Sequence, residues 1–163
     1  MGTHYKGPAP ERRALDAYIK LMRASESVSA RLERSLVPRR LSLTQLGILE
    51  ALWHLGPMCQ RDIGRRMLRS AANITSAIDQ LEGRRLVRRE RNNEDRRFTT
   101  VGLTAEGSRA IGQVFPGHVR EIVGAMRTLS AAEQEELGRL CRKLGLANRA
   151  GEAEAPRAAG GRA

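Results

Sequence analysis

The chain of 163 residues is poor in aromatic residues and contains only two cysteines, Cys59 and Cys141. Two cysteines are too few for a disulfide framework. Phenylalanine, tryptophan and tyrosine together make up 3% of the chain, whereas hydrophobic residues make up 40%. The core must therefore be mostly aliphatic, and the many leucines, alanines and arginines favour helices.

Long apolar stretches are also missing. The sequence has no run of 18 apolar residues, which excludes a membrane-spanning helix. The first ten residues are polar, include Pro8 and Pro10, and lack the apolar stretch of a signal peptide. We therefore expect a cytoplasmic protein in which residues 1–10 form a flexible arm.

Acidic residues are scarce relative to basic ones. The chain has 29 lysines and arginines against 18 aspartates and glutamates, so its formal net charge is +11. Such an excess attracts polyanions, and DNA, RNA and anionic membranes are the candidates. Charge alone does not choose among them, because an arginine-rich composition from a GC-rich genome would give the same excess.

Residue sets for catalysis or metal binding are missing as well. The sequence shows no glycine-rich phosphate loop, no nucleophile motif and no paired acids with a plausible pocket. The histidines and cysteines show no metal-ligand spacing; they are His4, His54, His118, Cys59 and Cys141. We therefore expect no enzyme, no metal and no cofactor.

The apolar periodicity predicts a mainly helical chain. The expected helices cover 11–37, 45–55, 60–68, 71–82, 104–129 and 131–147. Thr44 and Ser70 are the expected N-caps of the second and fourth helices, and Ser130 begins a capping box before the sixth. The dipeptide Pro116-Gly117 should kink or break the fifth helix. From Asn148 onward the composition predicts disorder.

A hairpin is expected between the fourth and fifth helices. Residues 86–91 and 97–103 favour strands, and Asn92-Asn93-Glu94-Asp95 favours a turn. Seven arginines lie between Arg84 and Arg97. Two short helices followed by a basic hairpin are typical of a helix-turn-helix with a wing, in which a helix about 12 Å across enters the major groove.

The outer face of the fourth helix is suited to contact DNA. Asn73 and Gln80 carry amides of the kind that pair with adenine edges, and small neighbours allow a close approach. Asp79 is unfavourable beside phosphates, and we expect it to pair with an arginine instead. The alternative is an ordinary solvated helix face, but the adjacent arginine-rich hairpin makes that alternative a poor explanation.

Two segments carry a family resemblance: LTQLGILEALWHLGP at 43–57 and NITSAIDQLEGRRLVRRERNNEDRRFTTVGLTAEG at 73–107. Their order and spacing resemble the multiple-antibiotic-resistance regulator (MarR) family. The resemblance implies a winged helix domain over 11–147. Within it, 42–103 would form the DNA-binding lobe, 11–37 and 104–147 would form a helical dimerisation lobe, and 148–163 would be a disordered tail.

One position departs from the family pattern. The family commonly has glycine directly before the Leu-Val of the wing, where this chain has Arg85, with Gly83 two positions earlier. Glycine at such a position normally supplies a positive φ after a helix. We expect either that the helix ends at Gly83 or that Arg85 adopts a strained backbone.

The resemblance also implies residue roles. The candidate DNA contacts are Arg69, Ser70, Ala71, Asn73, Thr75, Ser76, Gln80, Arg96 and Arg97. Asp95 should orient Arg97 into the minor groove, or else it only caps the turn, and Thr75 could instead pack internally. The expected protein is a homodimeric repressor on a pseudo-palindromic operator in double-stranded DNA. The alternative is an architectural protein that coats DNA with little sequence preference.

Family members often release DNA when a small aromatic ligand binds or a cysteine is oxidised, and 49–70 most resembles the branch that responds to quinones and catechols. The candidate ligand contacts are Tyr18, Trp53, His54 and His118. For each, a simpler interpretation exists: Trp53 would pack in the core, His54 would lie at the surface or at the end of its helix, and Tyr18 would pack in the dimer. Cys59 precedes a helix N-terminus, which makes a thiol more reactive, although a small buried hydrophobe is the simpler interpretation here too.

Overall fold

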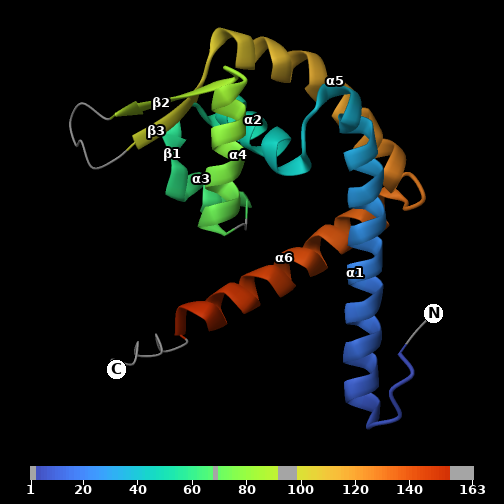
Figure 1. Ribbon diagram of the computed structural model, residues 1–163. Coiled ribbons are helices and arrows are strands. Elements are labelled where there is room, and N and C mark those ends of the chain that lie inside the picture. Colours follow the sequence, from blue (N-terminus) through green and yellow to red (C-terminus); the bar gives the residue numbers. More distant parts are fainter. Residues whose placement is uncertain (1–2, 68–69, 92–98, 155–163) are drawn as a thin grey trace, which may run out of the picture. The chain divides into compact units, whose positions relative to one another are not determined.

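The computed structural model describes residues 3–67, 70–91 and 99–154 (Figure 1). The chain divides into two compact units, Met1–Ala125 and Met126–Ala163. The elements are α1 (Ala9–Leu36), the 3-10 turn η1 (Val37–Arg39), α2 (Leu43–Leu55), β1 (Met58–Cys59), α3 (Gln60–Met67), α4 (Ala71–Gly83), β2 (Val87–Arg91), β3 (Thr99–Leu103), α5 (Ala105–Met126) and α6 (Ala131–Glu154). The fold is mainly α with a small sheet, as expected. Among the described residues, no helix has the length and apolar character needed to cross a membrane.

The core of the first unit is aliphatic, as the composition predicts. The cluster of buried side chains comprises Leu36, Leu41, Leu46, Ile48, Leu49, Leu52, Ile63, Ile74, Ala77, Ile78, Leu81, Leu86, Val87, Val101 and Ile111. These side chains come from all the helices α1 to α5 and from two strands. They hold α3 and α4 against α2, so the position of α4 is fixed by apolar burial.

The first helix begins slightly earlier than predicted, at Ala9 rather than Glu11. A proline in the first turn is compatible with a helix, because the missing N–H has no partner there in any case. The segment before the helix is tied back to it. The Thr3 N–H donates to Asp16 Oδ1 at 2.8 Å, and the Tyr5 hydroxyl donates to Glu11 Oε2 at 2.6 Å.

The prediction of Thr44 as the N-cap of the second helix was wrong. The cap of α2 is Ser42, whose Oγ accepts the Gln45 N–H at 3.1 Å, while the Ser42 N–H donates to Gln45 Oε1 at 3.0 Å. This capping box satisfies two backbone donors at once, which explains why it prevails. Ser70 caps α4 as predicted, accepting the Asn73 N–H.

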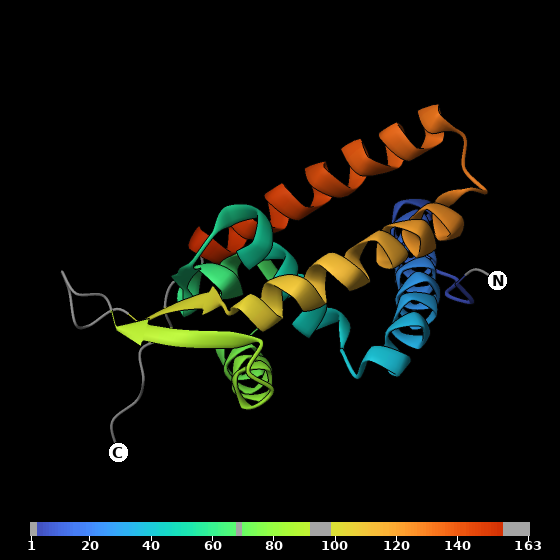
Figure 2. The same cartoon turned by 90° about the horizontal axis from the view of Figure 1, so that it is seen from above.

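The described strands form an antiparallel sheet in the order β1–β3–β2 (Figure 2). Val87 pairs with Leu103 at the base of the predicted hairpin, and Met58 pairs with Val101 on the other side of β3. The two-residue strand β1 was not predicted, because it is too short to show an alternating pattern. It ties the chain between α2 and α3 to the hairpin.

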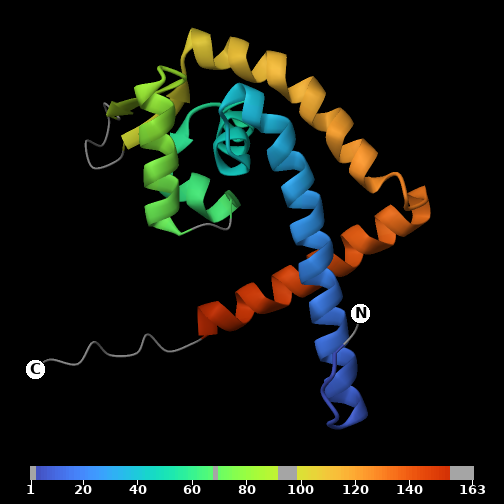
Figure 3. The same cartoon turned by 45° about the vertical axis from the view of Figure 1, so that its right-hand side comes forward.

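Helix α5 runs from Ala105 to Met126 and continues through Pro116. Of the two predicted effects of this proline, a kink or a break, the break does not occur. The helix curves along its length (Figure 3). In the second unit, Ser130 and Glu133 form the predicted capping box of α6. This helix extends to Glu154, into the segment expected to be disordered. Alanine, arginine and glutamate there are strong helix formers, which accounts for the difference.

The end of α4 shows how the chain accommodates arginine in place of glycine. The helix ends at Gly83, and Arg85 has a φ of +58°. The Arg85 N–H donates to the Glu82 carbonyl at 2.8 Å, and the Leu86 N–H donates to the Leu81 carbonyl at 2.9 Å. These two bonds form a Schellman motif with Arg85 at the left-handed position that glycine usually occupies. Both expected alternatives therefore hold together.

Candidate nucleic-acid interface

One face of α4 is polar and exposed. Ile74, Ile78 and Leu81 are buried on the opposite face and anchor the helix to the core. The exposed residues near its first turns and along its outer side are Ser70, Ala71, Ala72, Asn73, Ser76 and Gln80. The structure therefore brings five of the predicted contacts, Ser70, Ala71, Asn73, Ser76 and Gln80, together on one surface.

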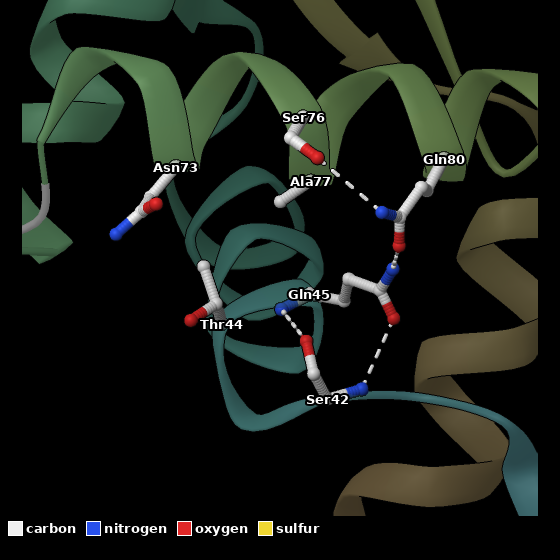
Figure 4. A pocket seen from close by; sticks show the side chains of 7 residues that line it. All are labelled: Ser42, Thr44, Gln45, Asn73, Ser76, Ala77 and Gln80. Atoms are coloured by element: carbon white, nitrogen blue, oxygen red, sulfur yellow. Dashed lines mark hydrogen bonds between the residues drawn. The ribbon is translucent and has the colours of Figure 1, made fainter.

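A hollow separates the start of α2 from this face of α4. It is lined by Ser42, Thr44, Gln45, Asn73, Ser76, Ala77 and Gln80 (Figure 4). The side chains of Thr44 and Asn73 point toward the same open side of this hollow. Sequence reasoning did not connect α2 with the interface, although the Ser-x-x-Gln pattern that places Ser42 and Gln45 there was visible.

A chain of hydrogen bonds crosses the hollow from α2 to α4. Gln45 is 6% exposed, and its Nε2 donates to Gln80 Oε1 at 2.7 Å. Gln80 in turn donates from Nε2 to Ser76 Oγ at 3.3 Å. The exposed amide of Gln80 is thus held at both its oxygen and its nitrogen, and its orientation is fixed before any ligand binds.

Thr75 faces the protein. Its Oγ1 donates to the Ala71 carbonyl at 2.9 Å and accepts a hydrogen bond from Gln60 Nε2 of α3. The side chain is half-buried. These bonds match the internal role that the sequence left open and join α3 to α4, while a DNA contact by Thr75 stays a prediction.

Acidic residues at the end of α4 are neutralised by the hairpin, as predicted for Asp79. Arg89 of β2 forms ion pairs with Asp79 and Glu82. Burial alone would lower the pKa of Arg89, but its hydrogen bonds to Asp79 and Glu82 raise that pKa overall. The Arg89 N–H also donates to Glu82 Oε1 at 3.0 Å. The pairing ties the hairpin to α4 and reduces the negative charge beside that helix.

Other predicted contacts lie outside the described residues. They are Arg69 before α4 and Asp95, Arg96 and Arg97 at the tip of the hairpin. Within the described part of the hairpin, Arg88 is exposed and forms an ion pair with Glu90 at 2.5 Å. At the opposite end of β2, Arg84 donates to the carbonyls of Arg39 and Arg40, which fixes the end of α4 to the α1–α2 connection.

The predicted ligand contacts fall into different surroundings. Trp53 is 43% exposed, so the prediction of a core tryptophan was wrong. Its ring packs against His54 at a centroid distance of 4.9 Å and against Phe115 of α5 at 5.7 Å. The position near the C-terminal end of α2 lets the indole lie across the surface instead of entering the core. Tyr18 is 61% exposed on α1.

His118 is buried on α5, one turn beyond Phe115. It is 8% exposed, and its Nδ1 is buried without a hydrogen-bond partner among the described residues. Burial lowers the pKa of His118, and Glu50 partly opposes this effect. The histidine borders a hollow lined by Ser35, Leu36, Arg39, Gln113, Val114, Gly117, Arg120 and Glu121. This hollow therefore places two arginines beside a buried histidine.

Cys59 lies in β1, directly before α3, and is half-buried. Its thiol donates to Asp62 Oδ2 at 2.9 Å, and Asp62 also forms an ion pair with Arg65 at 3.6 Å. The thiol is thus partly accessible but engaged with a carboxylate. Within the described ranges, histidines, cysteines and acids do not gather in a group of three that would hold a metal ion.

The elements now described define a class of protein. A helix-turn-helix whose second helix presents a polar face, followed by a hairpin that packs against it, is the arrangement of winged-helix DNA-binding proteins. The MarR family model matches residues 41–99. The chain is 30% identical to the HTH-type transcriptional regulator MhqR of Bacillus subtilis over 134 residues, covering 82% of this chain and 92% of MhqR.

A second relative from Bacillus subtilis, the HTH-type transcriptional regulator YkoM, is 33% identical over 134 residues, or 82% of this chain and 87% of YkoM. The chain therefore belongs to the MarR family and is a DNA-binding transcriptional regulator, not an enzyme.

Solved structures agree on the fold. AbsC, a MarR family transcriptional regulator of Streptomyces coelicolor, superposes with a TM-score of 0.79 at 22% identity, covering 90% of this chain and 99% of AbsC. Sco3205 from the same organism, in complex with DNA, gives 0.77 at 21% identity over 88% and 91% of the two chains. Bordetella bronchiseptica BpsR, whose DNA binding is regulated by 6-hydroxynicotinic acid, gives 0.73 at 23% identity over 79% and 98%.

Proposed function

We propose that this regulator is a homodimeric repressor that binds a pseudo-palindromic operator through α4 and the wing. The observation that carries the proposal is the polar face of α4, which is anchored by buried isoleucines and leucine and presents Asn73, Ser76 and Gln80 to solvent. Asn and Gln amides recognise base edges in the major groove. A protein that only coats DNA has no need of such a face.

Exposed apolar side chains support the dimer. They lie on α1 (Leu15, Tyr18 and Met22), on α5 (Val119, Ile122 and Val123) and on α6 (Leu137, Leu140 and Leu144). Apolar side chains left exposed on a helix mark an interface when they are not covered within the subunit. A two-fold dimer would place its two recognition helices in successive major grooves, with half-sites about 10 bp apart.

The remaining contacts come from the sequence prediction. In this proposal Arg96 contacts phosphate, Arg97 enters the minor groove with Asp95 orienting it, and Arg69 contacts the backbone at the start of α4. Ser70 and Ala71 lie at that same end of the helix. Phosphate contacts set the position of the protein, whereas base contacts set its sequence preference.

Replacing Asn73 by alanine tests whether α4 contacts bases. The variant should lose about 1–3 kcal/mol of affinity for the operator and much less for random DNA, because only the base contact is removed. The measurement is fluorescence anisotropy on both duplexes at several salt concentrations. Ser108→Ala, on the exposed side of α5, is the control and should change neither affinity. Equal losses of Asn73→Ala on both duplexes would mean that Asn73 contacts phosphate only.

We further propose that a small aromatic ligand releases the DNA by binding in the hollow beside His118. Arg39 and Arg120 would hold a phenol or carboxylate oxygen, and the buried imidazole of His118 would form part of the wall of the hollow. Catechol, benzoquinone and 6-hydroxynicotinic acid are suitable probes. One of them should lower operator affinity of the wild type but not of His118→Leu. A probe that acts equally on both proteins would place the ligand elsewhere.

Oxidation of Cys59 is the alternative release mechanism. The thiol is half-buried and its nearest polar partner is the Asp62 carboxylate. If it is the sensor, peroxide should release the wild type from its operator and leave Cys59→Ser bound. Release of both proteins, or of neither, would exclude Cys59 as the sensor.

A further inference from the structure

The buried amide of Gln45 lies directly beneath Gln80, the residue farthest along the exposed face of α4. Gln45 is 6% exposed, and a polar side chain at that depth needs a partner for both its oxygen and its nitrogen. Its Oε1 accepts the backbone N–H of Ser42, and its Nε2 donates to Gln80 Oε1. Both requirements are therefore met by one residue from α2 and one from α4.

The direction of this chain is set by the backbone. The N–H of Ser42 can only donate, so the oxygen of Gln45 must face Ser42 and its nitrogen must face Gln80. If the Gln80 amide turned over, two NH₂ groups would face each other. The Ser76 hydroxyl can donate as well as accept, so it tolerates either orientation of Gln80, and the Gln45 amide sets the orientation. The polarity of the exposed Gln80 amide is thus determined by a residue that lies inside the protein.

The consequence concerns which base edge Gln80 can contact. One lone pair of its oxygen is occupied by Gln45, while its Nε2 keeps one hydrogen beyond the bond to Ser76. An N–H donor matches O6 and N7 of guanine, N7 of adenine or O4 of thymine. It does not match cytosine, whose major-groove edge offers only the N4 donor.

We propose that Gln45 is a positioning residue that sets the base preference of the recognition helix without touching DNA. It does so by holding Gln80 as a hydrogen-bond donor, which favours the acceptor edges of guanine, adenine and thymine over cytosine. The inference rests on the proposed function, since it assumes that α4 lies in the major groove.

Gln45→Glu is the decisive variant. Glutamate also serves at the third position of a capping box, so it accepts the Ser42 N–H and preserves the start of α2. Its carboxylate has no hydrogen to donate, so Gln80 must turn its own Nε2 toward residue 45. Its oxygen then faces the base. The preference at this position should change from discrimination against cytosine to a preference for the donor groups of cytosine or adenine over guanine and thymine.

The experiment measures affinities for operator duplexes that carry each base pair at each half-site position. Gln80→Ala first identifies the position at which Gln80 acts, as a loss of about two- to tenfold preference, the size expected for a single hydrogen bond. Gln45→Glu should invert the preference at that position. Gln45→Met removes the amide donor and keeps a similar side-chain volume, so it should abolish the preference. This variant also keeps the test valid if Gln45→Glu does not fold.

Gln60→Glu is the matched control. Gln60 is also a glutamine that contacts α4 from another helix, but it bonds to Thr75 and not to Gln80. Its added charge should weaken binding to all duplexes alike and leave the preference at the Gln80 position unchanged. This separates the effect of amide polarity from the effect of a negative charge near phosphates.

Two results would overturn the inference: an unchanged preference in both Gln45 variants, or no position at which Gln80→Ala alters preference. Either result leaves the proposed function standing as long as the wild type distinguishes its operator from random DNA. If the wild type prefers no sequence at all, the proposed function itself fails, and the two failures are therefore distinguishable.

Discussion

Arg85 holds a backbone conformation that glycine adopts more readily than any other residue. Its φ is +58°, and the hydrogen bonds of the Schellman motif on either side keep it there. For an L-residue with a Cβ, the left-handed region costs about 1–2 kcal/mol. Glycine avoids that cost but loses more conformational freedom on folding, by about 0.5–1 kcal/mol. Arg85→Gly should therefore stabilise the fold by about 0.5–1 kcal/mol.

Thermal unfolding at fixed protein concentration measures this effect. For a chain of this size, 1 kcal/mol corresponds to a rise in Tm of about 2–4 °C. Arg85→Ala is the matched control, because it removes the same exposed side chain and charge but keeps the Cβ that causes the strain. The glycine variant should melt above the wild type, and the alanine variant should not.

The comparison of the two variants is the critical one. If Arg85→Gly and Arg85→Ala melt at the same temperature, the backbone strain contributes nothing and the reasoning is refuted. A rise in both variants would instead point to repulsion among the neighbouring arginines. Operator binding measured on the same proteins would show whether Arg85 also contributes charge to the interface.

Three further outcomes are expected. Gly107→Ala should destabilise the fold by about 1–3 kcal/mol in urea unfolding, because a Cβ there would lie 1.8 Å from the Leu86 carbonyl oxygen and force the backbone to move; an unchanged midpoint would refute this contact. Because burial lowers the pKa of His118, the unfolded state binds more protons, so stability should fall as pH drops below 6.5, and His118→Gln should weaken this pH dependence. Arg89→Ala should lower stability by about 1 kcal/mol and weaken DNA binding, since Asp79 would lose its partner beside the phosphates. Unchanged operator affinity in an anisotropy titration would contradict the predicted effect on DNA binding.

The helices were predictable because their apolar spacing and their breakers agree. Ser70 and the Ser130 capping box marked helix starts correctly, and Asp79 found the arginine partner expected of it. These features depend on neighbours along the chain or on a simple charge rule. They need no knowledge of tertiary contacts.

The features that were missed depend on contacts between distant segments. Strand β1 exists because β3 offers it an edge. The ring of Trp53, near the end of α2, packs against Phe115 of α5, which is 62 positions away, and stays partly exposed. The bond between Gln45 and Gln80 joins residues that are 35 positions apart, so no local pattern reveals it. The candidate site was therefore predictable as a helix face but not as a hydrogen-bonded network.

The most direct test of sequence-specific regulation is selection of bound duplexes from a fully randomised DNA library, followed by affinity measurement at 150 mM salt. A specific dimer should enrich two inverted half-sites about 10 bp apart and bind them at least about a hundredfold more tightly than random DNA. Failure to enrich any sequence, with equal affinity for all duplexes, would contradict this account and favour an architectural protein that coats DNA.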